Sequence, residues 1–232
     1  PWTPEDPFLY LVSLKSSADR VSSYFAMRKC DIQTAPDGTQ RFFLNNKPYF
    51  QAGVLDQGYW PESLYTAPTD EALIADISRM KELGFNMLRK HAKIEPDQKG
   101  GDILSLHYYF LKLKFKPESK RAAALTEFGG YSLSIPGHSC CKKVYGYKKF
   151  NSTGTLTYGY IDLIRQTILP AVKKGIGATV YTQLSDIEEE TNGIYTYDRE
   201  ICKIDPDTLR KWNRALKEAG ECKTYADHTT DH

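Results

Sequence analysis

The sequence predicts an α/β fold in which an all-β segment is followed by β/α units that build a parallel sheet. Two observations carry this prediction. Residues 8–50 alternate short runs rich in β-branched and aromatic residues with polar turns, a pattern typical of antiparallel strands. From residue 69 onward, helical patterns are followed almost directly by short apolar runs, as in β/α units. The chain therefore changes its organisation shortly after residue 50.

The all-β segment is predicted from apolar runs separated by turn chemistry. Pro36-Asp37-Gly38 has the residues of a turn, and Asn45-Asn46 is a dipeptide that tolerates the left-handed conformation of tight hairpins. Residues 15–20 are polar and separate the first two runs. The strand candidates are Phe8–Ser13, Val21–Met27, Phe42–Leu44 and Tyr49-Phe50.

A helix is predicted between Thr69 and Gly84. Thr69 is a suitable N-cap, acidic residues follow it where a helix N-terminus favours negative charge, and Gly84 offers a C-terminal cap. The apolar residues between them recur at helical spacing. Phe85–Leu88 follows at once and is expected to be a buried strand, which completes one α-to-β step.

A second unit of this kind is predicted later in the chain. Ala122–Thr126 is expected to be a buried strand, followed by a helix from about Thr155 to Lys174 and a strand over Ala178–Thr182. Pro170 should kink or shorten that helix, because proline lacks the backbone N–H. Ile103–Leu106 is a further strand candidate.

Composition excludes several classes of protein. The 232 residues carry 31 Lys+Arg against 29 Asp+Glu, and 41% are hydrophobic, which is incompatible with global disorder. This balance argues against nucleic acid as the main partner, and no apolar run reaches the roughly 18 residues of a membrane span. The five cysteines form no CxxC pair and no zinc-type spacing. No metal and no cofactor are predicted.

Polar residues follow the predicted strands of the β/α units. In a (β/α) barrel, groups just past the carboxyl ends of the strands converge on one mouth, where the chemistry takes place. The sequence therefore predicts a site built from residues that are distant along the chain. Its candidates are Arg89 and His91, His107 to Tyr109, Glu127, and Gln183 with Asp186.

Glu127 is the most informative of these candidates. It ends an apolar strand and precedes Phe128 and two glycines, so a substrate can approach open backbone beside a rigidly held carboxylate. Alternation along a strand puts Arg89 and His91 on one face, and an arginine beside a carboxylate keeps it ionised, as a nucleophile must be. The alternative is a barrel-lining ion pair that only stabilises the fold.

Several segments, in their order along the chain, resemble glycoside hydrolase family 2, the group of β-galactosidases, β-glucuronidases and β-mannosidases. The resemblance covers roughly residues 1–212, with gaps. It rests on FQAGV (50–54), QGYWP (57–61), TDEA (69–72), GFNMLRKH (84–91), KIEP (93–96), TEFGG (126–130), YTQLSD (181–186) and NG (192–193).

The resemblance implies a domain organisation and an activity. Residues 1–41 would be part of an immunoglobulin-like β-sandwich, and residues 42–232 an incomplete (β/α)8 barrel. The activity would be retaining hydrolysis of β-glycosides, with a carbohydrate as the partner and Glu127 as the nucleophile, contacted by Arg89. The other implied substrate-binding residues are His91, His107, Tyr109 of a His-x-Tyr element, Gln183 and Asp186 on strand eight, and Tyr59 and Trp60 after strand one.

The departures from the family pattern concern the second catalytic carboxyl group. The family's acid/base glutamate lies in an Asn-Glu pair, and this sequence contains none. The barrel is expected to be incomplete between about residues 97 and 101, and fewer residues follow position 42 than the about 250 of a usual barrel. Glu95, Asp56 and Asp186 are the replacement candidates.

Three interpretations follow. The sequence is a partial record of a longer glycosidase, a catalytically inactive relative that binds sugar or a partner, or a structural component. The first is favoured because the resemblance begins inside a domain and an abrupt junction falls at residues 97–101. Retention of Glu127 with Arg89, His91, Tyr109 and Trp60 argues against a purely structural component. The sequence does not decide the sugar or the oligomeric state. It leaves the compartment open, with a secreted or periplasmic location slightly favoured because the first residue, Pro1, is not a methionine.

Overall fold

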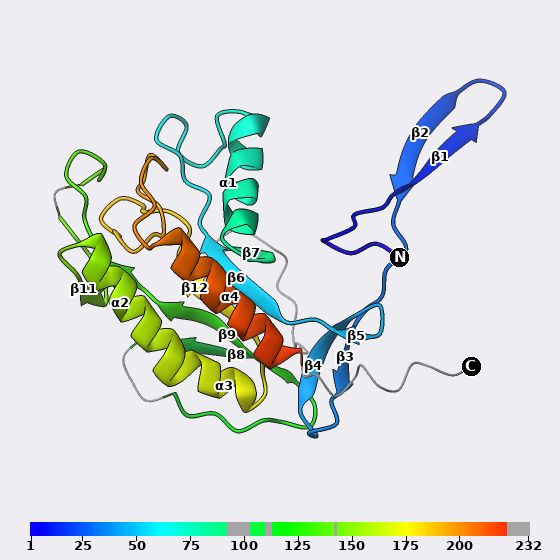
Figure 1. Cartoon of the computed structure of the whole chain (residues 1–232). Coiled ribbons are helices and arrows are strands. Elements are labelled where there is room, and N and C mark those ends of the chain that lie inside the picture. The colour runs from blue at the N-terminus through cyan, green and yellow to red at the C-terminus, as the bar shows by residue number, and fades with distance from the viewer. Residues whose placement is uncertain (92–102, 110–112, 142, 222–232) are drawn as a thin grey trace.

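A five-stranded parallel sheet forms the centre of the computed structural model, which describes residues 1–91, 103–109, 113–141 and 143–221 (Figure 1). The strand order is β7-β6-β12-β9-β8, and all four neighbouring pairs are parallel. The carboxyl ends of all five strands therefore meet at one edge. The strands are β6 (Gln51–Asp56), β7 (Met87–Lys90), β8 (Ile103–Tyr108), β9 (Ala122–Gly129) and β12 (Ile176–Thr182).

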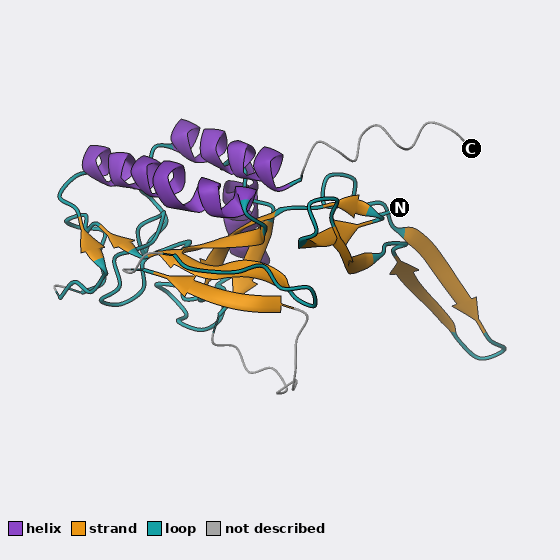
Figure 2. Cartoon of the chain, turned by 90° about the horizontal axis from the view of Figure 1, so that it is seen from below, coloured by secondary structure: helices purple, strands orange, loops and turns teal. Residues whose placement is uncertain are grey.

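Helices lie along one face of this sheet (Figure 2). Apolar side chains from these helices and from β6, β9 and β12 form one core, which includes Val54, Leu125, Leu156 and Ile176. The strand β12 is buried at all seven positions, as expected for a central parallel strand. The helical elements are α1 (Asp70–Glu82), α2 (Thr153–Leu163), the π-helix η1 (Ile164–Ile168), α3 (Leu169–Lys173) and α4 (Pro206–Gly220).

The N-terminal residues form two separate antiparallel sheets. One is a hairpin of β1 (Tyr10–Lys15) and β2 (Arg20–Phe25), which extends away from the rest of the molecule (Figure 1). The other has the order β3-β4-β5, and its strands are Cys30–Thr34, Gln40–Leu44 and Lys47–Pro48. Two short strands, β10 (Tyr131–Ser132) and β11 (Lys148–Lys149), pair near the site.

The antiparallel hairpins predicted from turn chemistry are confirmed. Asn45 and Asn46 both have positive φ, 53° and 64°, between β4 and β5, as a tight hairpin requires. The strand β4 begins at Gln40 and therefore crosses the position 41/42 at which a domain boundary is expected. Its Phe42 ring lies about 3.1 Å from a hypothetical Cβ on Gly177, so β4 packs closely against β12.

The first predicted helix is confirmed at both ends. Thr69 is the N-cap, and its hydroxyl accepts from the N–H of Ala72 at 3.2 Å. Gly84 follows the helix with φ +86°, the left-handed conformation that glycine adopts at low cost. The following strand starts at Met87 rather than Phe85, because the Asn86 side chain binds Phe50 O and Ala52 N before β7 pairs with β6.

Pro170 changes the second predicted helix without ending it. The helical path runs from Thr153 to Lys173, but the turn Ile164–Ile168 before Pro170 is a π-helix. Proline removes one backbone donor and crowds the preceding turn, and a π-turn is one way for a helix to accommodate that. The predicted strands at Ala122 and Ala178 are also confirmed, each longer than expected.

The helix α4 was not anticipated, although its signals are present in the sequence. The Asp205 carboxylate accepts from the N–H of Thr208 at 2.7 Å, and Pro206 occupies the first turn, where its missing N–H has no cost. Leu209 and Leu216 are buried at helical spacing.

The described strands do not close into a barrel, and the N-terminal sheets do not form a sandwich. The central sheet is open, with β7 and β8 as its edges. The structure therefore confirms an α/β fold with a parallel sheet and not a complete (β/α)8 barrel or an immunoglobulin-like domain. In the described part of the chain, no helix is long and apolar enough to span a membrane.

Two glycines of α2 give a matched test of helix packing. A Cβ on Gly159 would lie 2.4 Å from Cζ of Phe150, whereas a Cβ on Gly154 would meet nothing within 4 Å. We expect Gly159→Ala to lower the free energy of unfolding by about 1–3 kcal/mol through overpacking. Gly154→Ala should leave it unchanged or raise it by up to about 1 kcal/mol. Urea unfolding measures both, and equal effects would contradict the close packing of Phe150 on α2.

Candidate active site

Glu127 lies near the carboxyl end of β9, on a rigid central element. The four residues that begin this strand, Ala122 to Leu125, are all buried apolar side chains. The side chain of Glu127 is 12% exposed. The fold therefore holds this carboxylate in place at the edge where the five parallel strands end.

Four side chains from the two edge strands of the sheet, β7 and β8, or from the residues that directly follow them, surround the carboxylate of Glu127. Arg89 Nη1 donates to Oε1 at 3.0 Å, and the Tyr109 hydroxyl donates to Oε2 at 2.6 Å. His91 Nε2 lies 3.4 Å from Oε1, and His107 Nδ1 lies 3.3 Å from Oε2. These residues come from β7 and β8 or follow them directly. The structure thus brings together four of the residues that the sequence places beside Glu127.

Two of these partners are themselves fixed. Arg89 Nη1 also donates to the carbonyl of Thr126 at 3.1 Å, so one guanidinium nitrogen binds both the strand and its carboxylate. The Tyr109 hydroxyl lies 3.2 Å from Oγ1 of Thr182, at the end of β12. The ring of Tyr109 stacks on Tyr147, with 4.0 Å between centroids. Both donors are therefore oriented before any ligand arrives.

Aromatic rings lie close to the backbone of both Gly129 and Gly130. Both have positive φ, 95° and 62°. A Cβ on Gly130 would lie 2.4 Å from Tyr147 and 3.1 Å from Tyr109, and one on Gly129 would lie 2.6 Å from the ring of Tyr181. Glycine is thus needed here both for the backbone conformation and for the approach of the rings.

The surroundings of Glu127 favour its ionised form. Burial alone would raise the pKa of Glu127, but hydrogen bonds from Tyr109 and Arg89 and the charge of His107 outweigh burial and lower it. Burial and the hydrogen bond to Glu127 raise the pKa of Tyr109, so its hydroxyl keeps its proton. The arrangement is chemically suited to a carboxylate that acts as a nucleophile or stabilises a positive charge.

Gln183 and Asp186 lie after β12, but neither contacts Glu127. Gln183 is buried, and its Nε2 donates to Glu190 at 3.0 Å and to Asn192 at 2.8 Å. Asp186 is buried and pairs with the fully buried ammonium of Lys203 at 2.5 Å. Asp186 thus belongs to an internal network rather than to the group around Glu127.

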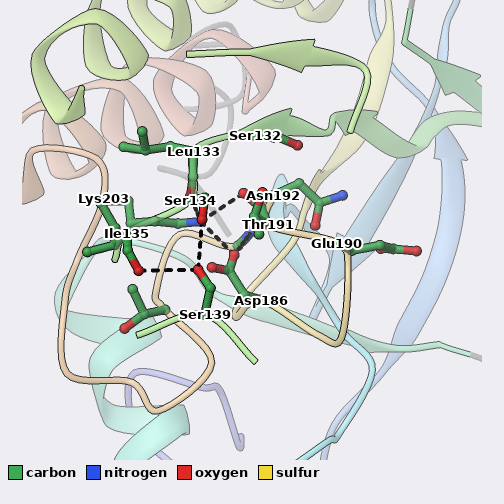
Figure 3. A network of polar contacts seen from close by, with 12 residues as sticks. Ser132, Leu133, Ser134, Ile135, Ser139, Asp186, Glu190, Thr191, Asn192 and Lys203 are labelled. Atoms are coloured by element: carbon green, nitrogen blue, oxygen red, sulfur yellow. Dashed lines mark hydrogen bonds and ion pairs between the residues drawn. The ribbon is translucent and has the colours of Figure 1, made fainter. Parts of the chain in front are cut away.

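Lys203 joins three segments at the back of the site (Figure 3). Its Nζ donates to Asp186 Oδ1 and, at 2.9 Å in each case, to the carbonyls of Leu133 and Thr191. Asp186 Oδ1 also accepts from the N–H of Gly193 at 2.8 Å. Burial raises the pKa of Asp186 to about 6 in spite of Lys203. These bonds fix the loops that follow β9 and β12.

Tyr59 and Trp60 follow β6 on a loop that Arg199 contacts. Trp60 is 6% exposed, and the guanidinium of Arg199 lies over its ring at 4.3 Å from the centroid. Arg199 also donates to the carbonyl of Tyr59 at 2.6 Å. Neither aromatic residue is among the partners of Glu127, and their substrate-binding roles stay predictions.

The replacement candidates for the second catalytic carboxyl group are engaged elsewhere. Asp56 is buried, binds Lys90, and accepts from the N–H of Gly58 at 2.7 Å. Asp186 binds Lys203. Glu95 and the junction at residues 97–101 lie outside the described residues. No free general acid is present among the replacement candidates that the structure describes.

Two residues near the site were not predicted. Tyr147 stacks on Tyr109, and Glu190 accepts from the side chains of Gln183 and, at 3.4 Å, Gln57. Glu190 ends a run of three glutamates that resembles a solvated loop. Only the amide hydrogen bonds single out the third glutamate, and sequence spacing does not reveal them.

One group of described residues has a possible metal-binding geometry, although no metal is predicted from the sequence. Ligand atoms of His138, Asp198 and Glu200 lie within 4.8 Å of one another. His138 Nδ1 and Asp198 already form a hydrogen bond of 2.7 Å, and the Glu200 side chain is 70% exposed. The contacts are explained by this hydrogen bond without an ion.

Tyr109→Phe tests the electrostatic environment of Glu127. Loss of the hydroxyl removes a hydrogen bond to the carboxylate, so the pKa of Glu127 should rise. Because its folded pKa is lowered, Glu127 stabilises the fold above its unfolded pKa, and this stabilisation is lost as the pH falls through the folded pKa. The variant should lose less stability on acidification. NMR titration of labelled glutamate carboxyls measures the pKa of Glu127. Tyr158→Phe, on an exposed face of α2, is the control. An unchanged pKa of Glu127 in Tyr109→Phe would contradict the contact.

Lys203→Met tests the buried ion pair. The substitution leaves the Asp186 carboxylate and two carbonyls without their donor, and breaking a buried pair costs about 3–5 kcal/mol. Lys143→Met removes an exposed pair with Glu189 and should cost less than about 1 kcal/mol. Urea unfolding of the two variants compares these losses. A Lys203 variant as stable as the Lys143 variant would show that the network is dispensable.

Comparison with known proteins finds relatives at the level of structure. No protein-family model matches the chain. No curated protein matches it either. Among solved structures, a GH2 β-galacturonidase from Eisenbergiella tayi superposes with a TM-score of 0.64 at 14% identity, over 92% of this chain and 59% of that one.

Two β-glucuronidases are similar to the same extent. The enzyme from Ruminococcus gnavus gives a TM-score of 0.64 at 10% identity, over 93% of this chain and 57% of that one. The enzyme from Bifidobacterium dentium gives 0.63 at 14% identity, over 91% and 54%. The chain thus spans between half and three fifths of the length of these proteins. It has the fold of part of a glycoside hydrolase family 2 enzyme, as the sequence resemblance predicts.

Proposed function

We propose that this chain is part of a retaining β-glycosidase in which Glu127 is the nucleophile. The observation that carries the proposal is the environment of its carboxylate: both oxygens are bound, by Arg89 and Tyr109, at the carboxyl edge of a parallel sheet. Nucleophilic catalysis of this kind needs a fixed, ionised carboxylate, and the lowered pKa of Glu127 meets that need.

The proposed reaction has two steps. One carboxylate oxygen of Glu127 attacks the anomeric carbon, and the glycosidic oxygen leaves with its electron pair. The Tyr109 hydroxyl and Arg89 orient the carboxylate for this attack, and the remaining oxygen stays hydrogen-bonded. Water then hydrolyses the glycosyl ester and restores the carboxylate.

The second carboxyl group sets a limit on this chain's activity. A retaining glycosidase needs a general acid about 5–5.5 Å from the nucleophile, and such a group typically contributes 10²–10⁴-fold to the rate. Asp56 and Asp186 are held in ion pairs and do not fit this role. We therefore propose that the described residues can cleave only glycosides whose leaving groups need no proton.

The domain organisation proposed from the sequence accompanies this function. Residues 1–41 would belong to an immunoglobulin-like β-sandwich and residues 42–232 to an incomplete (β/α)8 barrel. The open edges β7 and β8 support the second proposal, because a barrel with strands missing leaves two free edges. The isolated hairpin β1-β2 supports the first, because large apolar residues such as Leu11 and Tyr24 are exposed on it.

A carbohydrate-binding role without hydrolysis is the second candidate. The ion pairs of Asp56 and Asp186 favour this role, because neither residue is then free to act as the general acid beside Glu127. In this case, Glu127 and its neighbours would bind sugar hydroxyls.

Covalent labelling distinguishes the two functions. A 2-deoxy-2-fluoro-β-glycoside with a dinitrophenolate leaving group needs no general acid, so the attack by Glu127 alone can form the glycosyl-enzyme. We expect the peptide that contains Glu127 to gain the mass of one fluorosugar when the galactosyl, glucosyl and mannosyl reagents are tested by mass spectrometry. Tyr109→Phe should slow labelling by at least tenfold, because the carboxylate loses an orienting donor.

Glu127→Gln is the control for this experiment, and it should take no label at residue 127. Folded wild-type protein that stays unlabelled with all three reagents would overturn the assignment of the nucleophile. Sugar binding without labelling would instead support the second candidate.

A further inference from the structure

Glu190 is a second carboxylate at the edge of the sheet where Glu127 lies, and the proposed chemistry does not use it. It lies on the loop that follows β12, in a tight turn closed by reciprocal backbone hydrogen bonds between Ile187 and Glu190 of 2.8 and 3.0 Å. The side chain of Glu190 points away from the Lys203 network, while Asp186 on the same loop points into it (Figure 3). The loop is therefore anchored on one side and presents a carboxylate on the other.

Two amide side chains hold this carboxylate. Gln183 Nε2 and Gln57 Nε2 both donate to Oε2 of Glu190, at 3.0 and 3.4 Å. Gln57 follows β6 and Gln183 follows β12, so donors from two adjacent strand ends fix one glutamate. A glutamate on a surface loop ordinarily has its side chain in water, whereas the carboxylate of Glu190 is fixed by two amide donors.

A continuous path of contacts connects Glu190 to Glu127. The Tyr109 hydroxyl binds Glu127 and lies 3.2 Å from Thr182, the residue directly before Gln183. Gln183, which binds Glu190, therefore directly follows a residue that contacts the Tyr109–Glu127 pair.

The cations of the site are already paired with other carboxylates. Arg89, His91 and His107 all lie within 3.4 Å of Glu127. Lys90 pairs with Asp56, and Lys203 is buried with Asp186. In the part of the chain that the structure describes, no lysine, arginine or histidine nitrogen lies within 4.0 Å of the Glu190 carboxylate. Its negative charge thus has no direct counter-ion there.

On the basis of the proposed glycosidase function, we propose that Glu190 is a specificity-determining residue that accepts hydrogen bonds from the hydroxyls of a neutral sugar and excludes uronic acids. A carboxylate acceptor binds hydroxyl donors strongly, because the hydrogen bond is charge-assisted. A uronic acid would bring a third negative charge next to Glu127 and Glu190, and juxtaposed like charges in a partly buried site are unfavourable. The superposed enzymes include one solved with D-glucuronic acid and one with galacturonate, so this chain would differ from them in ligand class.

Binding of two sugars that differ only at C6 tests the proposal. D-galactose carries a hydroxymethyl group where D-galacturonate carries a carboxylate, and D-glucose and D-glucuronate form a second such pair. Titration calorimetry or ligand-observed NMR on the whole chain at pH 7 gives the dissociation constants. We expect wild-type protein to bind at least one neutral sugar ten or more times more tightly than its uronate.

Three variants separate charge from hydrogen bonding. Glu190→Gln keeps an acceptor and loses the charge, so neutral-sugar binding should stay within about threefold while uronate binding improves by about tenfold. Glu190→Ala should weaken the binding of the neutral sugar as well. Glu188→Gln is the matched control, because Glu188 is exposed on the same loop, and it should leave the preference unchanged.

The outcomes distinguish this inference from the proposed function. Equal binding of both members of each pair, a preference for the uronate, or an unchanged preference in Glu190→Gln overturns the role of Glu190, even when the fluorosugar labels Glu127. Failure to bind any of the four sugars also overturns it. When labelling of Glu127 fails as well, the proposed function falls with it.

Discussion

The buried ammonium of Lys203 is the interaction on which the arrangement of this molecule depends. A charged group with no exposure to water is stable only when its hydrogen-bonding capacity is satisfied, and Lys203 achieves this with Asp186 and two backbone carbonyls. Those carbonyls belong to Leu133, directly after β10, and to Thr191 on the loop after β12. The Lys203 Nζ therefore fixes the segment around Leu133 relative to the loop after β12 that carries Glu190.

A second constraint is the density of charge at the carboxyl edge of the sheet. Parallel strands direct side chains from distant parts of the chain to one edge, and here that edge receives Glu127, Glu190 and Asp56 together with Arg89 and Lys90. Each carboxylate is compensated differently: Glu127 by cations and a phenol, Asp56 by a lysine, and Glu190 by amides alone. The different partners give the carboxylates different acidities: the pKa of Glu127 is lowered, whereas burial raises the pKa of Glu190.

Local signals in the sequence were sufficient for much of the fold and for the group around Glu127. The cap at Thr69, the positive φ at Gly84 and the disturbance at Pro170 are short-range effects, and each lies where the residue types indicate. Arg89 and Tyr109 could be placed beside Glu127 because strand alternation and a parallel sheet dictate which side chains converge. Their roles in a reaction stay predictions.

The remaining features depend on contacts that sequence spacing does not encode. The ion pair of Asp186 with Lys203 and the contact of Trp60 with Arg199 are examples. The substrate-binding roles of Asp186 and Trp60 stay predictions. Glu190 could not be distinguished from Glu188, because only the partners Gln57 and Gln183 separate the two.

The glycine at position 130 has a consequence for how this site can vary. Its backbone lies so close to the rings of Tyr147 and Tyr109 that any side chain there would displace them. Tyr109 in turn supplies the shortest hydrogen bond to Glu127. A larger residue at position 130 would displace Tyr109 and so remove a hydrogen bond that keeps Glu127 ionised. The size of residue 130 and the ionisation of Glu127 are therefore coupled through the aromatic stack.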